Sequence, residues 1–112
     1  MPNQSIHLDR VFQALADPTR RAVLERLGTG SAPVSELARP FKMALPSFAQ
    51  HLKLLEAGGL VRSRKAGRVR TYRLAPRAFE VAERWMTAQR AHWERRLDPL
   101  DDYLSDLKET EP

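Results

Sequence analysis

The hydrophobic periodicity of this chain switches from helical to strand-like at Gly58-Gly59, and that switch limits what the chain can fold into. Before the two glycines, apolar residues recur every three or four positions, which is typical of amphipathic helices. After them, residues 61–65 and 69–74 alternate between apolar and polar side chains, as half-buried strands do. Gly67 lies between these two runs and suits a tight turn. The sequence therefore predicts several short helices followed by one β-hairpin.

The segment before the hairpin divides into four expected helices. The first two lie within residues 8–30, starting at about Leu8, and Asp17-Pro18 predicts the start of the second, because Asp is a favourable N-cap and Pro fits the first turn. A short third helix is expected over residues 36–39, and a fourth opens in the segment 43–47 and ends near residue 57, so that residues 34–59 form a helix-turn-helix. In the second helix, three basic side chains are expected to face water or a partner: Arg20, Arg21 and Arg26.

Phe48, Leu52 and Leu55 recur at helical spacing in the fourth helix and predict its buried side. Phe48 is therefore interpreted as a core residue rather than as a platform on which bases stack.

Charge is distributed unevenly along the chain, whose formal net charge is +5. Residues 60–77 contain seven Lys or Arg and no acidic residue, whereas residues 78–112 contain five basic and nine acidic residues. One short segment thus carries more positive charge than the whole chain. A basic block on an ordered hairpin is typical of a nucleic-acid contact, and a solvated surface strand is the alternative. Solvated faces usually mix both signs, so the pattern favours nucleic acid.

Several function classes are disfavoured by what the sequence does not contain. It has no cysteine, which excludes disulfides and thiolate metal sites. It has no Gly-rich phosphate loop and no two histidines close together, so we expect neither an enzyme nor a cofactor. No apolar run approaches the roughly 20 residues of a membrane span, and the first residues lack the pattern of a secretory signal. These features predict a cytoplasmic protein with no membrane partner.

Two helices joined by a short turn and followed by a basic hairpin form a winged helix-turn-helix. The fourth helix is expected to enter the major groove, and the hairpin, residues 60–75, is the wing that contacts phosphates or the minor groove. Arg62 and Arg73 are expected instead to brace the hairpin against the body of the domain. The alternative to DNA contact is that the polar residues of the fourth helix form an ordinary solvated surface. The candidates for DNA contact are Lys42, Ser47, Gln50, His51 and Lys53 in the helix-turn-helix, and Arg64, Lys65, Arg68 and Arg70 in the wing.

Four stretches of the chain, in this order, resemble the ArsR/SmtB-type transcriptional regulators. They are residues 14–21 (ALADPTRR), residues 43–55 (MALPSFAQHLKLL), residues 59–61 (GLV), and Gly67-Arg68 followed by residues 72–74. The resemblance spans about residues 11–74 and implies a homodimeric repressor that binds a near-palindromic operator overlapping a promoter. Leu45 and Ala49 stand where members of that family often have Gln and Ser, so we expect one polar DNA contact to be lost.

Many regulators of that family sense metals, but this chain lacks their ligand patterns. The third-helix segment 35–39 contains no cysteine, and the last helix offers one histidine, His92, with Glu94 and Asp98 nearby. Because a stable zinc site needs about four suitable ligands, we expect no metal site and interpret His92 as an interfacial or surface residue. His7 is expected in a mobile N-terminal leader.

A long helix is expected after the wing, over residues 77–107, with a kink or a restart at Pro99. Its large apolar residues exceed what so small a core can cover and predict a dimer seam, with a ligand pocket as the alternative. The expected seam residues are Phe79, Trp85, Met86, Trp93, Leu100 and Leu104.

These observations predict a single dimeric domain, residues 1–112, that is mainly α with a small β-hairpin in the order α-α-α-α-β-β-α. Its expected partners are double-stranded DNA and a second copy of itself, and the sequence does not indicate which effector controls it. The alternative is a winged-helix docking or dimerisation module with no role in binding DNA. The basic wing favours DNA, because dimerisation alone does not need it.

Overall fold

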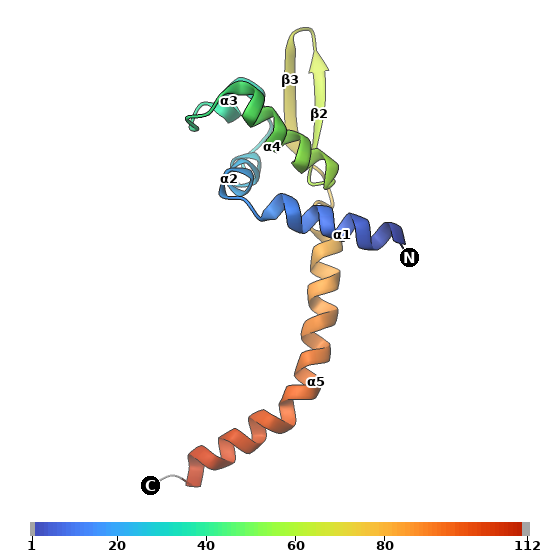
Figure 1. Ribbon diagram of the computed structural model, residues 1–112, viewed down its shortest axis with the longest axis vertical. Coiled ribbons are helices and arrows are strands. Elements are labelled where there is room, and N and C mark those ends of the chain that lie inside the picture. The colour runs from blue at the N-terminus through green and yellow to red at the C-terminus, as the bar shows by residue number, and fades with distance from the viewer. Residues whose placement is uncertain (1, 111–112) are drawn as a thin grey trace. The chain divides into compact units, whose positions relative to one another are not determined.

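The computed structural model describes residues 2–110, with side chains described at residues 6–97, 103, 104 and 107 (Figure 1). The chain divides into two units, residues 1–82 and residues 83–112. The helices are α1 (Pro2–Leu15), α2 (Pro18–Leu27), α3 (Val34–Ala38), α4 (Leu45–Ala57) and α5 (Glu80–Thr110). The strands are β1 (Ala32–Pro33), β2 (Val61–Ala66) and β3 (Val69–Leu74).

The predicted hairpin is present, and a third strand that the sequence did not predict joins it. β2 and β3 pair antiparallel with Ser63 opposite Tyr72, and β1 pairs with the other edge of β3 with Ala32 opposite Tyr72. The order across the sheet is β1-β3-β2. β1 has two residues, too few for any alternation to show, and it exists because β3 lies beside it. The predicted class, mainly α with a small hairpin, is confirmed with this addition.

α1 begins at Pro2, well before the predicted start at Leu8. His7 therefore lies in a helix, and its assignment to a mobile leader is wrong. A Cβ placed on Gly59 would lie 3.1 Å from Cε1 of His7, so the histidine ring packs beside the chain that leaves α4. The sequence did not indicate this early start of α1, because residues 2–7 are mostly polar and have no clear apolar period. The contact of His7 with the end of α4 forms only in the folded protein.

The two glycines at the end of α4 have different roles. A Cβ on Gly58 would lie 3.1 Å from the Arg10 carbonyl oxygen and 3.5 Å from the Ala14 Cβ, so glycine lets α1 and α4 approach closely. Gly59 has a φ of +73°, a left-handed backbone conformation that residues other than glycine rarely adopt. Gly58 thus positions two helices, and Gly59 turns the chain into β2.

One hydrophobic core lies between α1, α2, α4 and the sheet. Phe48 and Leu55 are 0% exposed, which confirms the predicted buried side of α4, and the ring of Phe41 stacks on Phe48 with centroids 5.6 Å apart. Arg20 is also buried, at 9% exposure, and the prediction that it faces water or a partner is wrong. The buried cluster consists of Val11, Ala14, Val23, Leu24, Leu27, Ala32, Leu37, Phe48, Leu52, Leu55, Leu60, Val61, Tyr72 and Ala82.

α5 begins at Glu80 rather than at residue 77, because residues 76–79 form turns after β3. It is one helix through Pro99 to Thr110, so the predicted restart is not observed, and the alternative, a kink at Pro99, stays a prediction (Figure 1). The side chain of Leu100 lies outside the described ones. No helix in the described part of the chain is both long and apolar enough to cross a membrane.

The close approach of α1 and α4 gives a first prediction. Gly58→Leu places a side chain against the Arg10 carbonyl and should lower the free energy of unfolding by about 1–3 kcal/mol, because the helices must separate. Urea unfolding followed by circular dichroism measures it. Gly67→Asn is the control: its Cβ meets nothing within 4 Å, and Asn tolerates the φ of +63°, so the change should stay within about 0.5 kcal/mol. Equal effects of the two substitutions would contradict the prediction.

Candidate nucleic-acid interface

One side of α4 is buried and the opposite side is exposed. Pro46 occupies the first turn, where its missing N–H breaks no helical hydrogen bond. Ser47, Gln50 and Lys53 are exposed on α4, and Lys42 is exposed in the loop before it. Gln50 lies two residues from both Phe48 and Leu52, which places it opposite the buried stripe. The helix-turn-helix candidates therefore lie on an accessible surface, with the exception of His51.

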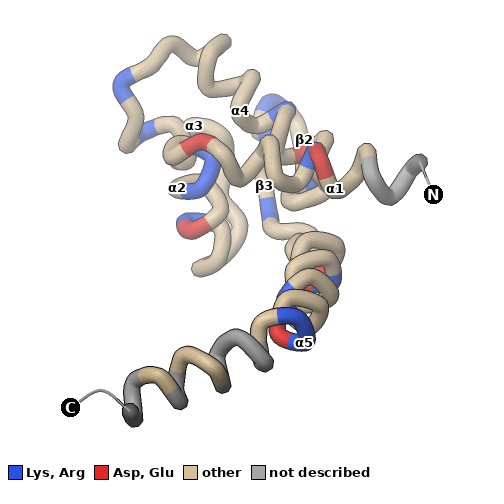
Figure 2. Tube along the Cα trace, turned by 60° about the horizontal axis from the view of Figure 1, so that its bottom comes forward, with Lys and Arg blue, Asp and Glu red and all other residues tan. Residues whose placement is uncertain are grey.

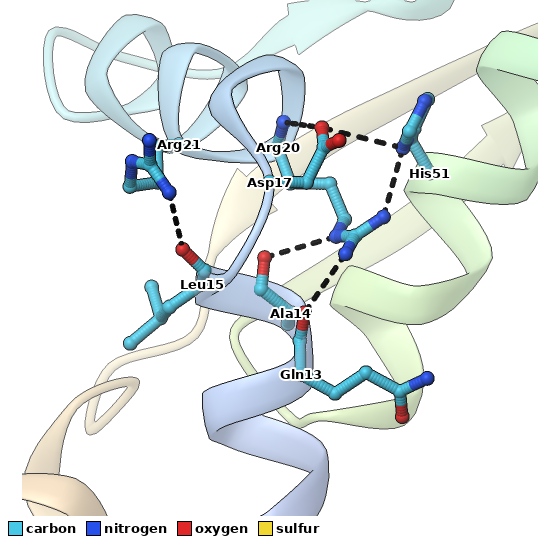
Figure 3. Close-up of polar contacts among 7 residues, drawn as sticks. All are labelled: Gln13, Ala14, Leu15, Asp17, Arg20, Arg21 and His51. Carbon is cyan, nitrogen blue, oxygen red and sulfur yellow. Dashed lines mark hydrogen bonds and ion pairs between the residues drawn. The ribbon is translucent and has the colours of Figure 1, made fainter.

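His51 is half-buried at the border of this surface, with its side chain 21% exposed (Figure 3). Its Nδ1 lies 3.0 Å from Nη1 of Arg20 and 3.7 Å from Oδ2 of Asp17. The same guanidinium donates through Nε to the Ala14 carbonyl at 3.0 Å and through Nη2 to the Gln13 carbonyl at 2.8 Å. These contacts join α1, the start of α2 and α4 at one polar junction.

Asp17 caps α2 as predicted. Its Oδ2 accepts a hydrogen bond from the backbone N–H of Arg20 at 3.1 Å. Burial alone would raise the pKa of Asp17, but the hydrogen bonds from the backbone N–H groups of Arg20 and Thr19 and the positive charge of Arg20 outweigh it, so the pKa lies below its usual value. The carboxylate thus stays ionised beside the guanidinium and the imidazole.

Strand pairing separates the basic residues of the wing onto two faces. Residues directly opposite each other share a face, and Arg62 lies opposite Arg73 whereas Lys65 lies opposite Arg70. Because side chains alternate along each strand, Arg64 lies on the same face as Arg62 and Arg73. We call this the outer face of the wing, and the face of Lys65 and Arg70 the inner face. All five side chains are exposed.

The inner face has an acidic neighbour. Nη1 of Arg70 donates to Oγ of Ser63 at 2.8 Å, and that hydroxyl donates to the carboxylate of Glu56 at the end of α4. Burial, with Glu56 nearby, raises the pKa of the Tyr72 phenol on the same face. Arg70 is therefore engaged within the protein.

The outer face carries three arginines and no acidic residue: Arg62, Arg64 and Arg73. Within the described chain, Arg62 and Arg73 make no side-chain hydrogen bond or ion pair, so the expected bracing contacts are not observed. Arg68 lies in the turn next to Gly67 and is exposed. The wing thus presents its uncompensated charge on one face and at its tip, and the turn end of the hairpin extends away from the helices (Figure 1).

Three features of this surface were missed from the sequence, and two of them left a signal. Arg20 lies four residues before Leu24 and seven before Leu27, so helical spacing already placed it on the buried side of α2. The alternation of β2 likewise placed Arg62 with Arg64, whereas Arg73 joins them only through the register of the hairpin. The approach of Glu56 to the wing had no signal, because it depends on how α4 packs against β2.

Four of the predicted seam residues are exposed on α5, and Phe79 lies in the turn just before it. Trp93 is 54% exposed, and Phe79, Trp85, Met86 and Leu104 are also exposed. A hollow on this helix is lined by Trp85, Met86 and Trp93 together with polar residues. Both basic and acidic residues lie on the described part of α5, as in the pair Arg90–Glu94 at 3.9 Å (Figure 2). Among the described residues, no group of three potential metal ligands comes together.

Several known proteins are similar to this chain in sequence and in structure. Residues 15–64 match the model of a helix-turn-helix domain family. The HTH-type transcriptional regulator Rv2034 of Mycobacterium tuberculosis is 52% identical over 68 residues, which cover 61% of this chain and 64% of that relative. The crystal structure of an ArsR family transcriptional regulator is 53% identical and superposes with a TM-score of 0.77, covering 84% of this chain and 94% of that one. The chain belongs to the ArsR family of transcriptional regulators.

This ArsR-family regulator also resembles the homodimeric winged helix-turn-helix DNA-binding domain Mb0332 from Mycobacterium bovis. The two are 30% identical, with a TM-score of 0.59 and coverage of 82% of this chain and 83% of that one. The winged helix-turn-helix predicted from the sequence is therefore confirmed, as is membership of a family of DNA-binding transcriptional regulators rather than of enzymes. The individual DNA-contacting residues stay predictions.

The charge of Asp17 gives a second prediction. Asp17→Asn keeps a capping oxygen and removes the charge. The folded-state pKa of Asp17 is lowered from 3.8, so ionisation stabilises the folded state above that value, and the stabilisation is lost as the pH falls through the folded pKa. The wild-type free energy of unfolding should exceed that of Asp17→Asn at neutral pH, and the difference should close in acid. Urea unfolding of both proteins, from neutral pH down into acid, measures the difference between their free energies of unfolding. A difference that does not change with pH would refute the role of the charge.

Proposed function

We propose that this regulator is a homodimeric repressor that binds a near-palindromic operator through α4 and the outer face of the wing. The observation that carries the proposal is the exposed arginine face, which has no acidic residue and lies on the same unit as an α4 with an exposed polar side. A helix of this kind fits the major groove, and arginines beside it neutralise phosphates or enter the minor groove. Repression follows if the operator overlaps a promoter.

Within this proposal the helix and the wing have different tasks. Gln50, at the centre of the exposed side of α4, reads base edges, with Ser47 beside it. Lys42 and Lys53 contact phosphates, and so do Arg64 and Arg68 in the wing. Arg62 and Arg73 join them because they share the outer face with Arg64. Lys65 and Arg70 contribute less to DNA binding, since they lie on the inner face and Arg70 donates a hydrogen bond to Ser63.

Dimerisation through α5 is the second part of the proposal. Exposed tryptophans and a methionine on one helix are costly in water and are typical of an interface between subunits. The homodimeric state of the Mb0332 domain supports this assignment. A two-fold dimer presents two copies of α4 and of the wing, which matches the two-fold symmetry of a near-palindromic operator.

The experiment that tests DNA binding compares the two faces of the wing. Arg64→Ala should weaken binding to every DNA sequence and lower the slope of log K against log salt by about one, because one phosphate contact is lost. Arg70→Ala, the matched inner-face variant, should change the slope less. Fluorescence anisotropy over a salt series measures both. A larger effect of Arg70→Ala would assign phosphate binding to the inner face, and binding that does not respond to salt would favour the docking-module alternative.

The dimer seam is tested with Trp93→Glu. Placing a charge in an apolar seam should weaken self-association roughly 30-fold or more. Ala88→Glu adds the same charge at an exposed α5 position off the apolar stripe and should leave the dimer intact. Sedimentation velocity at micromolar concentration measures both variants. A wild-type protein that sediments only as a 12.8 kDa species would overturn the proposed dimer.

A further inference from the structure

Arg20 is the buried charged side chain in the described part of the chain, and its contacts extend from the end of α1 to a side chain of α4. The guanidinium donates to two carbonyls in the last turn of α1, those of Gln13 and Ala14, and the Gln13 oxygen also accepts from the backbone N–H of Ala16 at 3.2 Å. A third N–H of the guanidinium reaches Nδ1 of His51 on α4 at 3.0 Å (Figure 3). One rigid side chain thus joins the end of α1 to the helix proposed to read DNA.

The chemistry of this third contact determines which nitrogen of His51 carries the proton. A guanidinium has five N–H donors and no acceptor, so Nδ1 of His51 must be the acceptor. A neutral imidazole that accepts at one nitrogen carries its hydrogen on the other, which here is Nε2. Figure 3 shows that second ring nitrogen directed away from Arg20 and Asp17. His51 therefore presents an N–H donor on the side facing away from its protein partners.

That donor lies at the border of the exposed side of α4. One turn of helix separates it from Ser47, and Gln50 is its neighbour in sequence. A single N–H donor matches an acceptor on DNA, either a phosphate oxygen or an acceptor atom of a base edge in the major groove. A histidine free to exchange tautomers would present this donor only part of the time.

We propose that Arg20 is a positioning residue for DNA recognition: by donating to Nδ1 it holds His51 as the Nε2–H tautomer and directs that hydrogen to an acceptor on the DNA. The proposal rests on the proposed DNA-binding function. Lysine cannot replace Arg20 in this role, because a single ammonium lacks the planar fork that reaches two carbonyls and an imidazole at once.

The tautomer is tested first in the wild-type protein. Long-range proton–nitrogen NMR correlations of ¹⁵N-labelled protein at neutral pH distinguish an Nε2–H imidazole from an Nδ1–H one. We expect the Nδ1 signal of His51 in the range of an unprotonated acceptor and the Nε2 signal in the protonated range. An Nδ1–H tautomer, or the averaged signals of rapid exchange, would overturn the proposal without any substitution.

The link to DNA is tested with a double-mutant cycle. His51→Phe removes both ring nitrogens and should weaken operator binding roughly 3- to 10-fold, whereas His51→Gln, whose amide reaches a position near that of Nε2, should recover most of the loss. Arg20→Lys should weaken binding in the wild type and have little further effect in His51→Phe, because the two residues act as one unit. Loss of affinity on random DNA as well as on the operator would assign the acceptor to phosphate, and loss on the operator alone would assign it to a base.

Arg21→Lys is the matched control. Arg21 is the next residue of α2 and also donates to a carbonyl at the end of α1, that of Leu15 at 2.8 Å, but it does not contact His51 (Figure 3). Arg21→Lys should therefore leave the His51 tautomer unchanged, and its effect on affinity should add to that of His51→Phe. Additive effects for Arg20→Lys, in a protein that binds DNA, would overturn the positioning role. Failure of the wild type to bind DNA would instead overturn the proposed function, and the proposal with it.

Discussion

The burial of one side of α4 is the constraint on which the rest of this regulator depends. Phe48, Leu52 and Leu55 are covered by α1, α2 and the sheet, and a helix whose one side is fixed in a core has its other side fixed as well. Gln50 and Lys53 are exposed for that reason. Gly58 allows α1 to pack closely on the end of the same helix, and Arg20 ties it to α2. The accessible polar surface is thus a consequence of packing.

In the wing, the register of the two strands determines which basic residues share a surface. A segment with seven basic residues and no acidic one is visible in the sequence, but the count does not say which of them act together. Antiparallel pairing places Arg62, Arg64 and Arg73 on one face and leaves Arg70 on the other, where it donates to Ser63, which in turn donates to Glu56. The functional consequence is that equal charges in the wing are not equivalent. Those without an acidic neighbour are the ones available to phosphates.

Membership of the ArsR family defines the general task, and the residues of this chain modify it. The sequence has no cysteine, and among the described residues no group of three potential metal ligands comes together. Leu45 and Ala49 leave an apolar stretch on the exposed side of α4, beside Gln50 and the border residue His51, which are proposed to contact DNA. The junction of Arg20, Asp17 and His51 then connects the helix scaffold to that recognition surface.

The sequence by itself determined the order of helices and hairpin, the buried stripe of α4, the Asp17 cap and the basic character of the wing, because each is a local pattern read within a few neighbouring residues. With closer attention to spacing it also contained the burial of Arg20 and the shared face of Arg62 and Arg64. Only the tertiary structure decided that β1 is a strand, that His7 lies against Gly59, and that Glu56 reaches Ser63 beside Arg70. Each of these contacts joins segments whose own sequences carry no sign of their partner, and it exists because packing of the core brings the two together.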